Sequence, residues 1–63
     1  MNTNLLKGII VSKELSQRKL ARMIGISEKT FYEKMKKGVF KSNEIELMIK
    51  ILDIKNPNEI FFK

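Results

Sequence analysis

Residues Ser16–Lys36 read SQRKLARMIGISEKTFYEKMK, and this stretch decides the fold of the chain. Ser16 and Ser27 are favourable helix N-caps, because a serine hydroxyl accepts a hydrogen bond from the free N–H groups of a first helical turn. Gly25 and Gly38 each follow a run of helix-forming residues, and glycine readily adopts the left-handed conformation of a helix C-cap. The stretch therefore predicts two short helices joined by a tight turn.

The apolar residues of this stretch have the spacing of two helices packed on one core. Ala21 is the small residue that is needed where the helices cross. Phe31 and Met35, four residues apart, form the buried stripe of the second helix. The other apolar clamps are Leu20, Ile24 and Ile26. Together with the glycine turn, these residues predict a helix-turn-helix.

Three further helices are expected on either side of this pair. One covers about Asn4 to Lys13, and another lies roughly between Ser42 and Leu52. The order Asn56-Pro57-Asn58-Glu59 is that of an N-cap, a first-turn proline and an N3 acid, so a short last helix is expected over Pro57 to Phe61. We expect an all-α, compact single domain of four to five short helices over residues 1–63, with the helix-turn-helix within it.

Composition excludes several kinds of protein. The chain has 63 residues with no Cys and no His, which excludes disulfides, zinc fingers and His-based catalysis. Carboxylates alone make a poor transition-metal site and none are paired on one face, so we expect no enzyme, no metal and no cofactor. The apolar run Leu5–Val11 is far shorter than the about 20 residues that span a bilayer, and it lacks a signal-peptide cleavage site. We therefore expect a cytoplasmic protein without a membrane partner.

The positive charge is confined to the middle of the chain. Lys and Arg number 13 against 7 Asp and Glu, which gives a net charge of +6. Between Ser16 and Lys41 lie eight basic and two acidic residues, and in the remainder five of each cancel. A solvated helical face is the simpler reading of one lysine cluster. Because the whole excess of positive charge is confined to one segment, a surface that binds a polyanion is favoured instead.

The stretch Ser16–Lys36 resembles the helix-turn-helix of the Cro and lambda-repressor-like family. The tail, from Gly38-Val39-Phe40 through Asn56–Phe62, is similar to that of small phage-encoded Cro and repressor proteins, so the resemblance covers nearly the whole chain. It implies a five-helix domain that binds palindromic operator DNA as a dimer, with the second motif helix in the major groove. Where many relatives pair an Arg with a Glu, this chain has Ile10 and Met35, and an apolar pair replaces a buried ion pair at little cost.

In that docking geometry the side of the second helix that faces away from the core reads bases. The expected base contacts are Glu28, Lys29, Tyr32 and Glu33. Lys29 can donate to guanine, and either acid can accept from cytosine N4. Simpler roles stay open for three of them: dipole capping for Glu28, pairing with nearby lysines for Glu33, and half-buried packing for Tyr32.

Phosphate contacts are expected around the same helix, where they position the protein without specifying sequence. The expected set is Gln17, Ser27, Lys34, Lys36, Lys37 and Lys41. The resemblance implies that Gln17 bonds a phosphate and braces the first turn of the second helix; a plain surface glutamine is the alternative. Ser27 caps that helix in either case.

The helix near Ser42–Leu52 carries two apolar sets, and these bear on assembly. The inner stripe is Ile45, Met48, Ile49 and Leu52. The second set, with one residue of the tail, is the expected dimer interface: Leu47, Ile51, Ile54 and Phe62. Cover by the Ile60-Phe61-Phe62 tail of the same chain is the alternative. We favour a mixture, in which Phe61 or Ile60 tucks in and the remainder forms a two-fold interface.

The leading hypothesis is a sequence-specific, double-stranded DNA-binding transcriptional regulator that acts as a homodimer and takes no small-molecule ligand. A second hypothesis is a small protein-interaction module, of antitoxin or antirepressor type, that uses the Ser42–Leu52 helix and the tail. A cationic membrane-active peptide is disfavoured, because the basic residues and the best apolar stripe lie on different helices.

Overall fold

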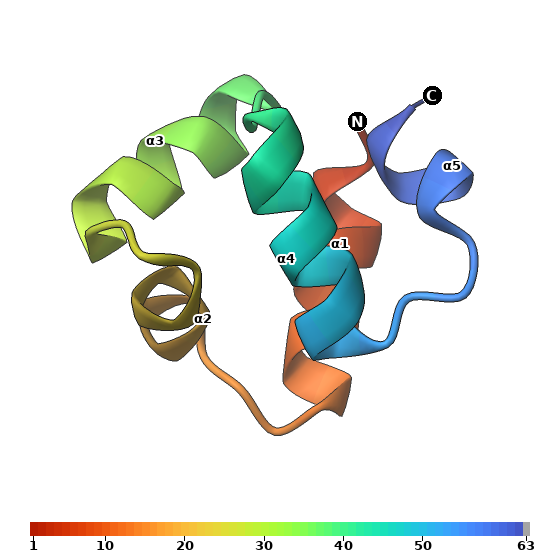
Figure 1. Ribbon diagram of the computed structural model, residues 1–63, viewed down its shortest axis with the longest axis horizontal. Helices are drawn as coiled ribbons and strands as arrows, with labels where there is room; N and C mark the ends of the chain where they lie inside the picture. The colour runs from red at the N-terminus through yellow and green to blue at the C-terminus, as the bar shows by residue number, and fades with distance from the viewer. Residues whose placement is uncertain (63) are drawn as a thin grey trace.

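The computed structural model describes residues 1–62 and contains five helices and no strand within them (Figure 1). The helices are α1 (Thr3–Ser12), α2 (Gln17–Ile24), α3 (Glu28–Lys37), α4 (Ser42–Leu52) and α5 (Pro57–Phe61). The all-α fold predicted from the sequence is therefore confirmed, and the bounds of α4 and α5 are those expected. α1 begins one residue earlier than expected, because Asn2 Oδ1 accepts a hydrogen bond from Leu5 N at 3.0 Å and caps the first turn.

The ends of α2 and α3 form as the local sequence predicts. Ser16 Oγ accepts from Lys19 N at 3.0 Å, and Ser27 Oγ accepts from Thr30 N at 3.1 Å. Gly25 and Gly38 end the helices with φ values of 87° and 71°, a conformation that costs glycine little. Only the short segment 25–27 separates the two helices, so they pack directly on each other.

The start of α5 differs from its expected form. Asn56 occupies the N-cap position, but its side chain makes no capping hydrogen bond. Pro57 at the first position presets the helical φ, and the helix is anchored from outside instead. Asn2 N donates to Ile60 O at 2.7 Å, which ties α5 to the beginning of the chain.

One apolar core draws residues from all five helices. Its buried members are Leu6, Ile10, Leu20, Ala21, Ile24, Phe31, Met35, Phe40, Met48, Leu52, Ile54, Ile60 and Phe61. Ala21 is fully buried, as expected for a residue at a helix crossing. Phe31 and Phe40 pack with their ring centroids 5.4 Å apart and their planes tilted by 58°. This pair secures α3 and the segment after it to the core.

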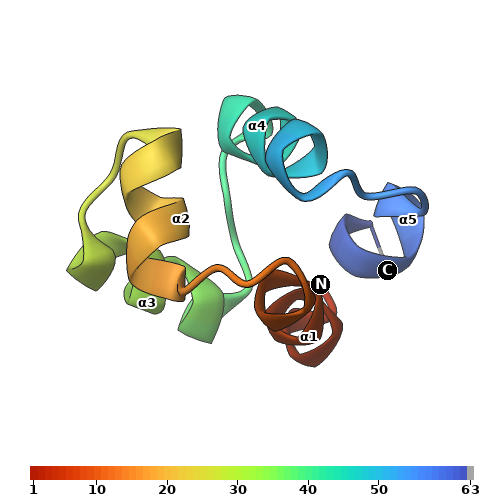
Figure 2. The same cartoon turned by 90° about the horizontal axis from the view of Figure 1, so that it is seen from below.

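The helices fall into two ends of the molecule. α2 and α3 lie together at one end, α5 lies at the other, and α1 and α4 are between them in both views (Figures 1 and 2). The segment with the excess positive charge, Ser16–Lys41, includes α2 and α3. The segment that carries the excess positive charge is therefore folded mainly into one end of the molecule.

Within residues 1–62, no helix is both long enough and apolar enough to cross a bilayer. The longest, α4, has 11 residues, about half of what a span requires. The same residues contain no group of three or more Asp and Glu side chains placed to hold a metal ion.

Candidate nucleic-acid interface

The outer face of α3 is polar and accessible. Phe31 and Met35 are buried, as predicted, so the opposite side of the helix points to solvent. Lys29 and Glu33 are exposed, and Tyr32 is half exposed. The structure thus brings together three of the four expected base-contacting side chains on one open face.

Glu28, the fourth, already has partners within the protein. Its Oε1 lies 4.0 Å from Arg18 Nε, which links the first turn of α3 to α2. A hydrogen bond with Glu28, followed by the charge of that carboxylate and slight desolvation, raises the pKa of the Tyr32 hydroxyl. The Arg18 side chain is 71% exposed and that of Glu28 is 41% exposed, so water screens the pair and it contributes little to stability. Its effect is to hold Arg18, which sequence reasoning did not assign to the site, beside the start of α3.

Lys34 does not lie where the sequence placed it. Its Nζ is 2.7 and 2.6 Å from the two carboxylate oxygens of Glu44 on α4, and the Lys34 and Glu44 side chains are only 21% and 5% exposed. The expectation that Lys34 is a surface phosphate contact is therefore corrected. Glu44 is buried, and a buried carboxylate requires a charged or hydrogen-bonding partner.

Glu44 is the site-supporting residue that sequence reasoning missed. It precedes Met48 and Leu52 at spacings of four and eight residues, so it shares their buried face of α4. The expected inner stripe had Ile45 and Ile49 in that role, but both are only partly buried. The signal that could have revealed Glu44 was an acid at helical spacing from two core residues.

The environment of Glu44 keeps it charged. Burial acts to raise its pKa, but hydrogen bonds from the Lys34 ammonium and the Lys41 N–H outweigh burial, and the two lysine charges add to them. The pKa of the carboxyl is accordingly lowered. The Lys41 N–H bond, 2.8 Å to Glu44 Oε1, also satisfies a free backbone donor at the start of α4.

The three other lysines of the expected phosphate-contacting set are accessible. Lys36 and Lys37 are exposed in the last turn of α3, and Lys41 is exposed just before α4. Ser27 is exposed, but its hydroxyl is engaged locally: it caps α3 and donates to Thr30 Oγ1 at 2.9 Å. The three exposed lysines thus lie between the last turn of α3 and the start of α4.

Gln17 is neither a plain surface residue nor a brace for α3. It is partly buried, and its Oε1 is enclosed without a hydrogen-bond partner among residues 1–62. The bracing hydrogen bond implied by the resemblance is therefore not made by this oxygen.

The outer face of α2 carries a second cationic surface. Arg18, Lys19 and Arg22 are exposed, and α2 has no acidic residue. Together with Ser16 and the half-exposed Met23, they line an open hollow of about 380 Å³. Its rim adjoins α3 at the Arg18–Glu28 contact.

The expected dimer residues separate into two groups. Leu47 and Phe62 are exposed, Phe62 by 64%. Ile54 is 9% exposed and belongs to the core, and Ile51 is partly buried against it, so the assignment of Ile54 to an exposed interface is wrong. In the tail, Ile60 and Phe61 are buried and Phe62 is not. The tail thus covers its own chain in part, and the two-fold interface formed by the remainder stays a prediction.

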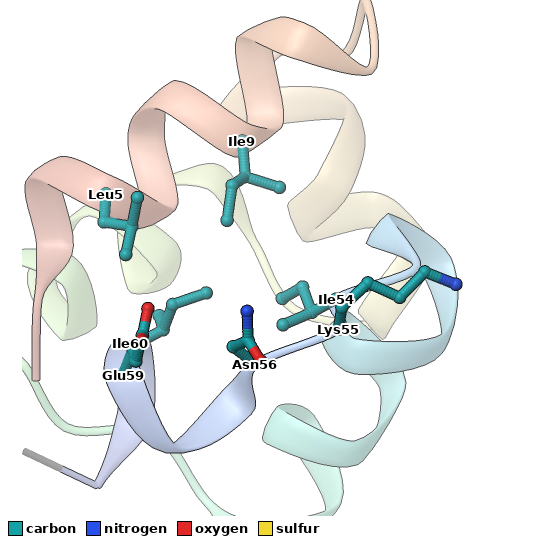
Figure 3. A pocket seen from close by; sticks show the side chains of 7 residues that line it. All are labelled: Leu5, Ile9, Ile54, Lys55, Asn56, Glu59 and Ile60. Atoms are coloured by element: carbon teal, nitrogen blue, oxygen red, sulfur yellow. The ribbon is translucent and has the colours of Figure 1, made fainter.

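A small pocket lies at the end opposite α3. Its volume is about 160 Å³, and Figure 3 shows Leu5 and Ile9 of α1 facing Ile60 and Glu59 of α5 across it. Residues 54–56, between α4 and α5, complete the lining. The walls are mostly apolar, and the charged residues among them are Lys55 and Glu59.

Comparisons with protein-family models, with curated proteins and with solved structures found no match to this chain.

Proposed function

We propose that this chain is a sequence-specific, double-stranded DNA-binding transcriptional regulator of Cro or repressor type. In this proposal α2 and α3 form a helix-turn-helix, and α3 lies in the major groove. The observation that carries it is the position of the positive charge. Seven of the eight basic residues of Ser16–Lys41 are exposed, and six of the seven lie on α2 and α3.

The role proposed for each residue follows from its position on the helices and from which of its polar groups are free to meet DNA. We assign base contacts to Lys29, Tyr32, Glu33 and Glu28 on the outer face of α3. Phosphate contacts are assigned to Gln17, Ser27, Lys36, Lys37 and Lys41. Since Gln17 buries its amide oxygen, its amide NH₂ is the group available to a phosphate. Lys34 is left out because its ammonium pairs with Glu44.

A homodimer on a palindromic operator accompanies this proposal. α5 lies at the opposite end of the molecule from α3 (Figure 1), and α4 meets α3 through the Lys34–Glu44 pair, which lies away from the outer face of α3. Leu47 and Phe62 expose apolar surface, and Ile51 is partly accessible. The same exposed residues favour the second candidate, a small protein-interaction module of antitoxin or antirepressor type that uses α4 and the tail. Either protein would act in the cytoplasm.

Selection of binding sites from a pool of random duplexes tests the function. The wild-type protein is expected to enrich one two-fold symmetric motif. The variant Lys29→Gln, Lys36→Gln, Lys37→Gln is expected to lose this enrichment. A matched control, Lys7→Gln, Lys13→Gln, Lys50→Gln, removes the same charge from exposed positions outside Ser16–Lys41 and is expected to retain it.

Two results would count against the proposal. If the wild-type protein enriched no motif, the claim that it binds DNA sequence-specifically would be wrong. If both triple variants bound DNA equally weakly, the binding would be only a non-specific attraction between a cationic protein and a polyanion. Either result would leave the protein-interaction module as the better account.

A further inference from the structure

We propose that Glu28 fixes the Tyr32 hydroxyl as a hydrogen-bond acceptor, so that Tyr32 meets the exocyclic amino group of a base pair and not its keto oxygen. Glu28 then acts as a positioning residue, and Arg18 holds it in place. The inference rests on the proposed function. It narrows the base contacts assigned there to Glu28 and Tyr32 to one contact of defined chemistry.

The first observation is that Glu28 and Tyr32 form a pair on the accessible side of α3. They are four residues apart, a spacing at which two side chains of a helix are neighbours. Phe31 is fully buried, whereas Tyr32 is half exposed and Glu28 is partly exposed. The Tyr32 hydroxyl and the Glu28 carboxylate are hydrogen-bonded. The hydroxyl is therefore accessible to a ligand while it is held by its neighbour.

The direction of this hydrogen bond decides what the hydroxyl can offer to DNA. An ionised carboxylate has no proton and accepts only, so the Tyr32 hydroxyl donates its single proton to Glu28. The bond to Glu28 and the negative charge of that carboxylate raise the pKa of the hydroxyl, which keeps its proton in place. What remains for a partner is the oxygen of Tyr32, which accepts.

Arg18 gives the Glu28 carboxylate a second partner. Its Nε lies 4.0 Å from Glu28 Oε1, and it comes from α2 rather than from α3. An exposed pair of this kind contributes little to stability, so its effect is on the position and the charge of the carboxylate. A cation next to Glu28 offsets the repulsion between an acid and the phosphates of a polyanion. The acid can therefore remain at the interface without contacting a base.

Base pairs in the major groove offer both kinds of partner. Each pair presents an amino donor, on adenine or cytosine, and a keto acceptor, on thymine or guanine. A hydroxyl with a free proton could meet either group and would discriminate poorly. A hydroxyl whose proton is committed to Glu28 can meet only the amino group. The exposed Lys29 ammonium has donors only and prefers the opposite group.

The test begins with the operator that wild type selects. The position read by Tyr32 is the one at which Tyr32→Phe relaxes the preference, because phenylalanine keeps the ring and removes the hydroxyl. Two modified duplexes then replace one base of this pair by an analogue, which lacks the exocyclic amino group in one duplex and the keto oxygen in the other. Wild type should bind the duplex without the amino group about five-fold more weakly or worse. Tyr32→Phe should be much less sensitive to the same change.

The role of Glu28 is tested at the same position. Glu28→Ala frees the hydroxyl proton, so this variant should relax the preference at the base pair that Tyr32→Phe relaxes. The double variant Glu28→Ala, Tyr32→Phe should relax it no further. The control Glu14→Gln removes an exposed acid outside α2 and α3 and should match wild type. Circular dichroism checks that each variant is folded.

A measurement without DNA checks the contact itself. Tyr32 is the only tyrosine, and the chain has no tryptophan, so the ultraviolet absorbance of tyrosinate reports on this hydroxyl alone. Glu28→Ala should lower the pKa of the Tyr32 hydroxyl. Glu33→Ala, which removes the neighbouring acid of α3, should lower that pKa less. Equal shifts would mean that charge alone acts on the hydroxyl, and they would overturn the inference.

Three results with DNA would also overturn it. One is a selected motif that Tyr32→Phe leaves unchanged. Another is a wild-type protein that is weakened by loss of the keto oxygen and not by loss of the amino group. The third is a Glu28→Ala variant that relaxes a different base pair from Tyr32→Phe, which would make Glu28 a base contact of its own. A wild-type protein that selects no motif would overturn the proposed function and this inference together.

Discussion

Lys34 Nζ lies within 2.7 Å of both carboxylate oxygens of Glu44, and this pair joins the C-terminal half of α3 to the first turn of α4. Glu44 Oε1 also accepts from Lys41 N at 2.8 Å. One buried carboxylate therefore holds the end of α3, the segment that follows and the start of α4 together. Lys41, whose side chain is exposed, is tied to this point through its backbone N–H.

Removing the Glu44 carboxylate is expected to destabilise the fold. Glu44→Ala leaves the Lys34 ammonium partly buried without a counter-charge, and such losses amount to about 3–5 kcal/mol in the free energy of unfolding. The double variant Lys34→Met, Glu44→Leu should recover most of that loss, because an apolar pair replaces a buried ion pair at little cost. Urea unfolding measures both. A Glu44→Ala protein as stable as wild type would show that the ion pair contributes nothing.

The lowered pKa of Glu44 predicts a loss of stability in acid. A carboxyl whose pKa is lowered by folding stabilises the fold at pH values above its ordinary pKa, near 4.5. That contribution disappears as the pH falls through the folded-state pKa. The unfolding free energy of wild type should therefore drop more steeply below about pH 4.5 than that of Glu44→Gln. Parallel pH profiles for the two proteins would contradict this assignment.

The helix crossing at Ala21 predicts a steric effect. Ala21 is fully buried between helices, so Ala21→Leu should overpack the crossing and destabilise the protein by about 1–3 kcal/mol. Val11→Leu is the matched control, because Val11 is exposed and can accept a larger side chain. Thermal unfolding separates the two variants. If both were neutral, the packing of α2 would be looser than described.

Salt dependence distinguishes the exposed lysines from the buried one. Lys36→Ala or Lys37→Ala should weaken binding to all duplexes about equally, and should reduce the log–log salt slope by about 1. The double variant Lys34→Met, Glu44→Leu should leave that slope unchanged, because the Lys34 charge is already neutralised within the protein. A reduced slope for this double variant would return Lys34 to the phosphate-contacting set.

The parts of the fold that follow from local chemistry could be predicted from the sequence. Ser16, Ser27, Gly25 and Gly38 fixed the ends of α2 and α3, because capping depends on residues within one turn. The burial of the Phe31 side chain was equally predictable, since a helix with one apolar stripe buries that stripe. Once the buried side of α3 was known, the residues on its outer face followed from helical spacing.

The parts that depend on contacts between distant residues could not be predicted. Glu44 and Lys34 are both ordinary surface residues by type, and only the packing of α4 against the rest brings them together. Ile54 and Leu47 looked equivalent by spacing, but Ile54 is taken into the core beyond the end of α4. The partner of Arg18 likewise depends on how α2 and α3 meet.

The central claim, that α3 reads base sequence, is tested most directly by Lys29→Ala measured on the selected operator and on a scrambled duplex. Lys29 is exposed in the first turn of α3, where a side chain can reach a base edge in the major groove. We expect Lys29→Ala to cost about 1–3 kcal/mol on the operator and little on the scrambled duplex. An equal loss on both duplexes would contradict the claim and make Lys29 a phosphate contact.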